Sequence, residues 1–467
     1  MTTRRKDYGA LHNNEEWIIP SLWMGLWNFI SPGCQMFGAI AGGYLQDRLG
    51  RRWSVFIGSV LCAVGVAICF ASNQTDSLTD RRVIFLVGKG IQGGAIGTCL
   101  ATAQTYLSEI LPPNLRGPVL AFFPIFTLLG QVIGALVIYA CLEKSNGYVI
   151  AFATQWPLSL FSAIGALVVP ESPTYHVRKD RLDLARNSQV KFAHPEEDVD
   201  QTVARLKVHI EHERSLAKAT YQDSFRHGNG RRTWIVVFAS LIPQLFGLTL
   251  MSKASYFVQI VGMKANLSVI VLILGIVVGL IANVCSMWFL NRFPRRLLIL
   301  WGFAVSALLW AGMGIAGIWS GQVVVWYTAG TMILVIVTCG LSCWPASHVV
   351  ASETSALHMR AKAQGIGYFA AGAGYAGFGF VLPYIFNPDQ GNLRAKTGFV
   401  YAGLCVLAVV ITWFYVPEMK GRTPAEIDRM FEQGLSARQF THFVNPDAVG
   451  GEEKKAQETR SVTGSVA

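Results

Sequence analysis

The chain has 467 residues, of which 52% are hydrophobic and only 14% are charged, and its formal net charge is +11. Charged residues make up about a quarter of a typical soluble domain, so this composition excludes an ordinary soluble protein and indicates a polytopic membrane protein. A basic chain can bind nucleic acid, but here Lys and Arg lie mainly between apolar runs, as membrane orientation requires. No nucleic-acid partner is expected.

The apolar runs follow a polar start. Residues 1–19 show neither the apolar core nor the cleavage site of a secretory signal. Eleven apolar segments follow, each near the ~20 residues that a helix needs to cross a bilayer. They lie near residues 20–45, 53–72, 83–107, 118–141, 150–170, 233–258, 268–290, 297–317, 323–350, 363–386 and 397–416. The predicted class is an all-α membrane protein with five spans in 20–171 and six in 233–416, separated by a polar loop, 172–232, and followed by a polar tail, 417–467.

Loop charges predict the orientation. Loops on the side of Asp47 to Arg52 hold 21 Lys and Arg residues, against 6 in the opposite loops. The first side is therefore expected to be cytoplasmic, together with the central loop and the tail, most simply at the plasma membrane. The two Asn-x-Ser/Thr sequons, at Asn73 and Asn266, fall on the other side and are glycosylation candidates. Eleven spans leave the N-terminal segment outside, which is unusual for a segment with three basic residues.

Several landmarks occur twice. Arg51–Arg52 precede Arg295–Arg296 by 244 residues, Glu109 precedes Glu353 and Arg116 precedes Arg360 by the same 244, and Pro170–Glu171 precede Pro417–Glu418 by 247. A nearly constant spacing indicates duplication, and parallel half-repeats are typical of transporters that work by alternating access. Five spans against six then predict that one span of the first half is missing.

An ordered set of motifs carries a family resemblance. The set comprises Gly43-x-x-x-Asp47-Arg48-x-Gly50-Arg51-Arg52, Tyr106-Leu-Ser-Glu109 through Arg116-Gly117, Pro170-Glu-Ser-Pro173, Gln244 with Gly247, and Pro417-Glu-Met-Lys-Gly-Arg422. Over residues 15–432 the chain resembles the sugar-porter family of the major facilitator superfamily, particularly its fungal maltose- and hexose-type members. The resemblance implies two bundles of twelve helices in all, without the first in this chain, and a monomeric secondary transporter of a sugar or sugar-like small polar solute, by uniport or proton symport. It implies no cofactor, and no Cys or His spacing predicts a metal site.

Charged landmarks at one membrane face are candidate gating residues. They are Asp47, Arg48, Arg51, Arg52, Glu109, Arg116, Arg295, Arg296, Glu353 and Arg360. The acids favour an ionic latch that holds the outward-facing state, because orientation rules do not require acids. The arginines could also reflect orientation alone. Each Glu is expected to pair with a neighbouring helix rather than with the Arg seven residues on. Asn291 and Pro294 replace an acid and a glycine of the first copy, so the second latch is expected to be weaker.

Polar residues inside the spans are candidate solute ligands. The resemblance places Gln131 and Gln244 in or near the sugar cavity and Thr249 at a family asparagine position. An amide both donates and accepts, which suits vicinal hydroxyls, although either glutamine could instead bridge helices. The usual polar positions are otherwise lost, at Pro124, Gly279, Ala371 and Gly372, so ordinary glucose recognition is not expected.

Two ionisable residues are unusual for such a cavity. Lys253 and His348 would suit an acidic or enolic ligand, and His348 could carry a proton. Alternatively, Lys253 reaches the outer interface and His348 bonds a helix carbonyl. On an unbroken helix Lys253 would point about 180° from Gln244 and about 40° from Thr249. The acid of proton-coupled relatives lies on the first helix, which leaves coupling open.

Other functions remain open. They are metabolite efflux, nutrient sensing without transport, and an inactive truncated isoform. No nucleophile–base constellation or phosphate loop predicts an enzyme.

Overall fold

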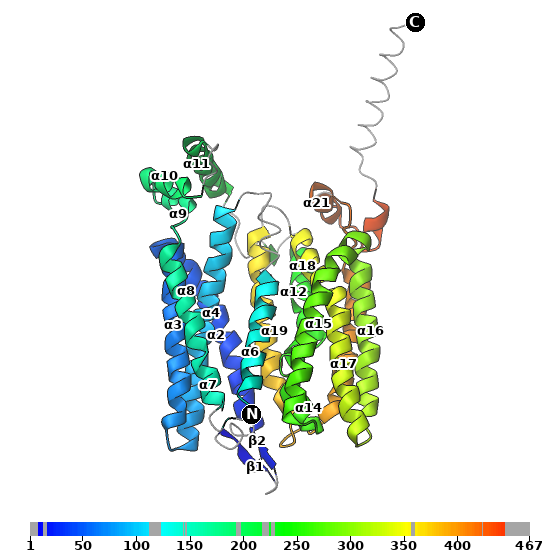
Figure 1. Cartoon of the computed structure of the whole chain (residues 1–467). Helices are drawn as coiled ribbons and strands as arrows, with labels where there is room; N and C mark the ends of the chain where they lie inside the picture. Colours follow the sequence, from blue (N-terminus) through cyan, green and yellow to red (C-terminus); the bar gives the residue numbers. More distant parts are fainter. Residues whose placement is uncertain are drawn as a thin grey trace.

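The computed structural model of the chain describes residues 8–12, 16–111, 123–142, 144, 147–192, 198–216, 224–225, 229–355, 360–422 and 424–443. Long, roughly parallel helices form two halves that follow one another in the sequence (Figure 1). The helical membrane class predicted from the sequence is confirmed.

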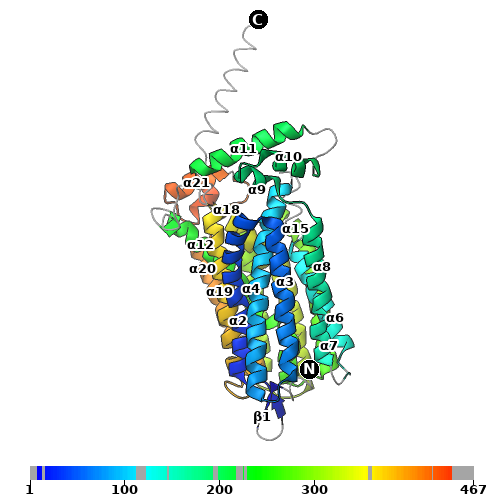
Figure 2. The same ribbon diagram turned by 90° about the vertical axis from the view of Figure 1, so that its left-hand side faces the viewer.

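The first half consists of α2 (Ser21–Leu49), α3 (Arg51–Ala71), α4 (Leu78–Ile110), α6 (Phe123–Ala140), α7 (Gly147–Ala153) and α8 (Gln155–Val168). Helices α2, α4 and α3 lie side by side when this half faces the viewer (Figure 2). Three short helices then lie at one end of the molecule: α9 (Pro173–Arg178), α10 (Leu182–Val190) and α11 (Val199–Leu216).

The second half consists of α12 (Asn229–Leu245), α13 (Leu248–Met251), α14 (Ala254–Val261), α15 (Ala265–Arg292), α16 (Arg295–Ala316), α17 (Gln322–Leu341), α18 (Cys343–Thr354), α19 (Arg360–Phe386) and α20 (Thr397–Tyr415). The tail helix α21 (Pro424–Glu432) lies at the same end as α9, α10 and α11 (Figure 1). We call this end the loop end.

A short hairpin marks the opposite end, which we call the hairpin end. Strands β1 (Ala10–His12) and β2 (Glu16–Ile18) pair antiparallel, with Ala10 opposite Ile18. No pattern in residues 1–19 predicted these strands. A hairpin can form here because a segment beyond the membrane helices can bond its backbone to itself and to water.

Nine helical segments among the described residues are long and apolar enough to cross a membrane. A helix lies at each of the eleven predicted segments, but α2 is not among the nine and α6 contributes only the shorter apolar stretch Phe126–Ala140. The number of eleven spans therefore stays a prediction.

The two halves are packed unequally. The second half has a large apolar core in which α12 lies against α18, α19 and α20. In the described part of the first half, the main apolar cluster is small and gathers around Tyr8, Trp27 and Phe85 near the hairpin end. Helix α6 packs chiefly on α15 of the other half and on α7 of its own. By the spacing of the repeated landmarks, α2 and α3 correspond to α15 and α16, and no described helix precedes α2 to correspond to α12.

Candidate functional site

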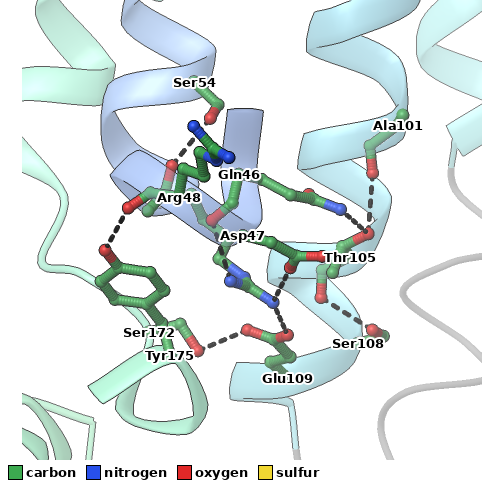
Figure 3. A network of polar contacts seen from close by, with 12 residues as sticks. Gln46, Asp47, Arg48, Ser54, Ala101, Thr105, Ser108, Glu109, Ser172 and Tyr175 are labelled. Carbon is green, nitrogen blue, oxygen red and sulfur yellow. Dashed lines mark hydrogen bonds and ion pairs between the residues drawn. The ribbon is translucent and has the colours of Figure 1, made fainter. Parts of the chain in front are cut away.

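The first charge cluster lies where α2 meets α3 at the loop end, and we define it as Asp47, Arg51, Glu109 and Glu171. Figure 3 shows Asp47 and Glu109 of this cluster beside Ser172. Helix α2 ends at Leu49, and Gly50 alone separates it from α3. Gly50 has φ +102°, which side chains rarely adopt, and a Cβ there would overlap the Glu171 carboxylate. Glycine is thus required for both the turn and the neighbouring acid.

Arg51 is the centre of this cluster. Its side chain is 1% exposed, and Nη2 donates to Glu109 Oε1 at 2.8 Å and lies 3.4 Å from Asp47 Oδ1. Nη1 donates to the Gln46 carbonyl oxygen at 3.0 Å. The second oxygen of Glu109 accepts from Ser172 Oγ at 2.5 Å. One guanidinium therefore connects α2, α3 and α4, and the pairing partner of Glu109 lies on a neighbouring helix, as the sequence predicted.

Glu171 binds the first turn of α3 from outside that helix. Its two carboxylate oxygens accept the backbone N–H groups of Arg51 at 2.9 Å and Arg52 at 3.1 Å. The first N–H groups of a helix have no partner within the helix, and a negative charge at that end is stabilised by the helix dipole. Glu171 thus fastens the end of α8 to the start of α3. Sequence reasoning noted its repeat but assigned it no role.

The second charge cluster, Arg295, Glu353 and Glu418, repeats the plan between α15 and α16. Arg295 Nη2 donates to Glu353 Oε1 at 3.3 Å. Glu418 accepts the backbone N–H groups of Arg295 at 3.2 Å and Arg296 at 3.0 Å. The spacing of the landmarks in the sequence therefore corresponds to a spatial repeat.

The second cluster has fewer contacts than the first. Within the described part of the chain, Glu353 Oε2 is buried without a hydrogen-bond partner, whereas the matching oxygen of Glu109 is bonded. Pro294 takes the place of Gly50, yet Glu418 still caps the helix. Whether the second pair is weaker stays a prediction.

The remaining gating candidates are placed as follows. Arg48 is exposed and lies over the Tyr44 ring. Arg52 donates to the Leu167 carbonyl oxygen, and Arg296 donates to that of Trp413 at 2.6 Å. The Arg116 and Arg360 side chains lie outside the described residues. Each ion pair of the two clusters lies within one half, and whether the clusters act as a gate stays a prediction.

The helical segment that runs from α12 to α14 is interrupted at two positions. Gly247 has φ +103° and separates α12 from α13, and Lys253 separates α13 from α14. Trp310 Nε1 donates to the Phe246 carbonyl oxygen at 3.0 Å, which satisfies a group released by the first break. The relative directions given for Lys253 on an unbroken helix therefore do not apply.

Two of the five predicted solute ligands are in contact. Gln244 is 4% exposed, and its Oε1 accepts a hydrogen bond from Thr249 Oγ1 across the break at Gly247. Lys253 is half-buried, and His348 on α18 and Gln131 on α6 are exposed. Among the described residues, no hydrogen bond or ion pair joins these three to Gln244.

Both sequons lie at the hairpin end. Asn73 Oδ1 accepts from the Tyr148 hydroxyl. Asn266 is exposed, but Ser268 of its sequon is buried and bonded to Gln259 Nε2 at 2.8 Å. The described residues contain no group of three or more His, Cys, Asp or Glu that could hold a metal ion.

Known structures share this architecture. The inward open conformation of the xylose transporter XylE from E. coli matches with a TM-score of 0.75 and 19% identity, over 92% of this chain and 94% of that chain. The XylE proton:xylose symporter bound to 6-bromo-6-deoxy-D-glucose matches with a TM-score of 0.69 and 19% identity, over 92% and 93%. At this identity the likeness shows the fold alone, which is the major facilitator fold.

Sequence relatives define the family. The MFS transporter fmqE of Aspergillus fumigatus is 28% identical over 441 residues, covering 93% of this chain and 81% of that protein. The hexose transporter HXT10 of Saccharomyces cerevisiae is 26% identical, covering 93% and 81%. The general alpha-glucoside permease of the same yeast is 25% identical, covering 94% and 72%.

Residues 1–431 match the family described as sugar (and other) transporter. The chain belongs to this family, which confirms the resemblance seen in its motifs. It is a transporter of the sugar-porter class that works by alternating access, rather than an enzyme.

Proposed function

We propose that the transported solute is a sugar or a sugar-like small polar organic molecule, bound between the halves beside the breaks in α12, α13 and α14. The observation that carries this proposal is the double interruption of one membrane path, at Gly247 and Lys253. Transporters of this general kind bind solutes near the midplane where helices are discontinuous, because backbone groups and polar side chains are available there.

Gln244 is the first proposed ligand. Thr249 occupies its carbonyl oxygen, so Gln244 would donate to a solute hydroxyl through its amide nitrogen. Thr249 in this proposal is a positioning residue that fixes the amide. A glutamine held in one orientation loses less side-chain entropy on binding than a free one.

His348 is proposed to face the space between the halves. Helix α18 packs on α12, α16 and α17 of its own half, and its exposed positions include His348 and Ser352, which are four residues apart. Positions four apart share one helix face, and we place this face toward the first half. An imidazole there can bond a solute hydroxyl or exchange a proton. Gln131 on α6 is proposed to line the same space, and Lys253 to select an acidic group.

The orientation follows from charge. We place the loop end in the cytoplasm, because the central loop alone carries 12 Lys and Arg residues. The exposed apolar surface of the helices then faces lipid, most simply that of the plasma membrane. The working unit is proposed to be a monomer, and proton symport and uniport both fit this arrangement.

Uptake in a host that lacks sugar transporters tests the proposal. Labelled hexoses, disaccharides, polyols and organic acids are compared at two pH values, with surface expression measured in parallel. We expect uptake of at least one polyhydroxylated solute. If uptake is faster at the lower pH and His348→Gln abolishes this increase, the transport is coupled to protons through His348. If the parent takes up only organic acids and Lys253→Met loses this uptake, the solute is an acid and not a sugar.

A further inference from the structure

The two halves are joined at the hairpin end by side chains that sequence reasoning did not single out. Ser21 is the first residue of α2 in the first half. Its backbone N–H donates to Asp389 Oδ2 at 2.7 Å, and its hydroxyl donates to Asp389 Oδ1 at 2.5 Å. Asp389 follows α19 in the second half, so this contact crosses between the halves.

Helix α2 has no cap of its own. The residue before it is Pro20, which makes no side-chain capping bond, and its first turn contains no acid. A free N–H group and the positive end of the helix dipole both favour a carboxylate at this position. Asp389 supplies that carboxylate from the other half.

A second bridge lies beside the first. The fully buried Asn387 donates from Nδ2 to the Ile19 carbonyl oxygen at 3.0 Å. Its Oδ1 accepts from the Tyr256 hydroxyl on α14 at 3.2 Å. Asn387 thereby links the segment just before α2 to α14, the last helix of the interrupted segment.

Helices α2 and α19 are in close contact at the hairpin end. A Cβ on Gly25 would lie 2.9 Å from the Phe380 carbonyl oxygen, and one on Gly379 would lie 3.1 Å from that of Asn28. Toward the loop end, Gly43 has nothing within 4 Å. The hairpin end is thus closed in this structure by direct contact of α2 with α19.

We propose that Asp389 and Asn387 form a gate that holds the hairpin end closed. Opening this end separates the halves, so it removes the cap of α2 and breaks the bond to Ile19. These residues act as positioning residues, because they set the balance between the two facing states without touching the solute. The inference rests on the alternating access of the proposed function, but not on the identity of the solute.

Thiol accessibility tests this gate. Asn28→Cys reports opening of the hairpin end, and Gly43→Cys reports opening of the loop end. Each reporter is labelled with a membrane-impermeant maleimide in cells and in inverted vesicles, and labelling of the parent chain is subtracted. In Asp389→Ala we expect Asn28→Cys labelling to rise about fivefold, the factor that matches a typical helix N-cap, and Gly43→Cys labelling to fall.

Asp76→Ala is the matched control, since Asp76 is an exposed acid in the loop between α3 and α4 at the same end. It should change neither labelling rate. Unchanged rates in Asp389→Ala, or a rise at both reporters, would overturn the gate, because a purely structural role gives no reciprocal shift. If Asp389→Ala does not reach the membrane, Ser21→Ala serves instead, because it removes the hydroxyl contacts to Asp389 and to the Pro383 carbonyl oxygen but keeps the backbone contact. It should raise Asn28→Cys labelling and lower Gly43→Cys labelling by smaller factors than Asp389→Ala. No shift in Ser21→Ala also overturns the gate. Labelling needs no solute, so failure to find a transported sugar leaves this result standing.

Discussion

Arg51 and Glu109 form an ion pair of 2.8 Å whose side chains are only 1% and 9% exposed. A guanidinium stays charged at any relevant pH, so loss of Glu109 would leave Arg51 buried with only the more distant Asp47 as a charge partner. The pair joins α3 to α4, and Gln46 and Ser172 extend its bonds to α2 and to the segment after α8. The first charge cluster is therefore a structural joint of the first half, whatever its role in gating.

Glu109→Ala should destabilise the protein by about 3 kcal/mol, because removing one partner of a buried pair leaves an uncompensated charge. Glu353→Ala is the matched comparison in the second half, where the pair is 3.3 Å apart and the Glu353 side chain is 27% exposed. There we expect about 1 kcal/mol or less. Thermal unfolding of the purified protein in detergent measures both. Equal shifts in the two variants would contradict the view that the second pair is the weaker one.

Glu171→Ala should cost about 1–2 kcal/mol, since the first turn of α3 loses the acceptor of two backbone N–H groups. Glu171→Gln keeps one acceptor oxygen and should fall between that variant and the parent. Glu211, exposed on α11, provides the control, and Glu211→Ala should leave the unfolding temperature unchanged. A Gln variant as unstable as the Ala variant would show that charge, and not capping, is what matters at this position.

Gly50→Ala should be strongly destabilising, because φ +102° costs a side chain roughly 1–3 kcal/mol and the added Cβ overlaps Glu171. Gly43 lies inside α2, and a Cβ there would meet nothing within 4 Å, so Gly43→Ala should be neutral or slightly stabilising. A double-mutant cycle of Gly50→Ala with Glu171→Ala should show coupling of about 1 kcal/mol. Additive effects would mean that backbone strain alone accounts for the loss.

Most of the fold could be predicted from the sequence. Apolar runs of membrane length and two copies of the same charged landmarks are compatible with few architectures. Pairing of Glu109 and Glu353 with neighbouring helices was also predicted, but Arg51 and Arg295 were not identified as the partners. Glu171 could not be read as a cap, since the N–H groups that it meets lie about 120 residues earlier in the chain. The Asp389 contact joins residues 368 positions apart and is equally invisible. The break at Gly247 depends on packing against Trp310 and Tyr401, which no local pattern shows.

The Gln244–Thr249 bond separates two roles for the glutamine. If Gln244 binds the solute, Gln244→Ala should abolish uptake at unchanged surface expression. Thr249→Val should then raise KM several-fold with a smaller effect on the maximal rate, because the amide is present but no longer held. If Gln244 only bridges the break in the helix, both variants should lower the unfolding temperature together and leave KM unchanged. Thr328→Val is the control, because Thr328 is a buried threonine of α17 that bonds only the Val324 carbonyl oxygen within its own helix. Normal uptake by Gln244→Ala would show that Gln244 is not a solute ligand, and His348 would then be the next candidate ligand to test.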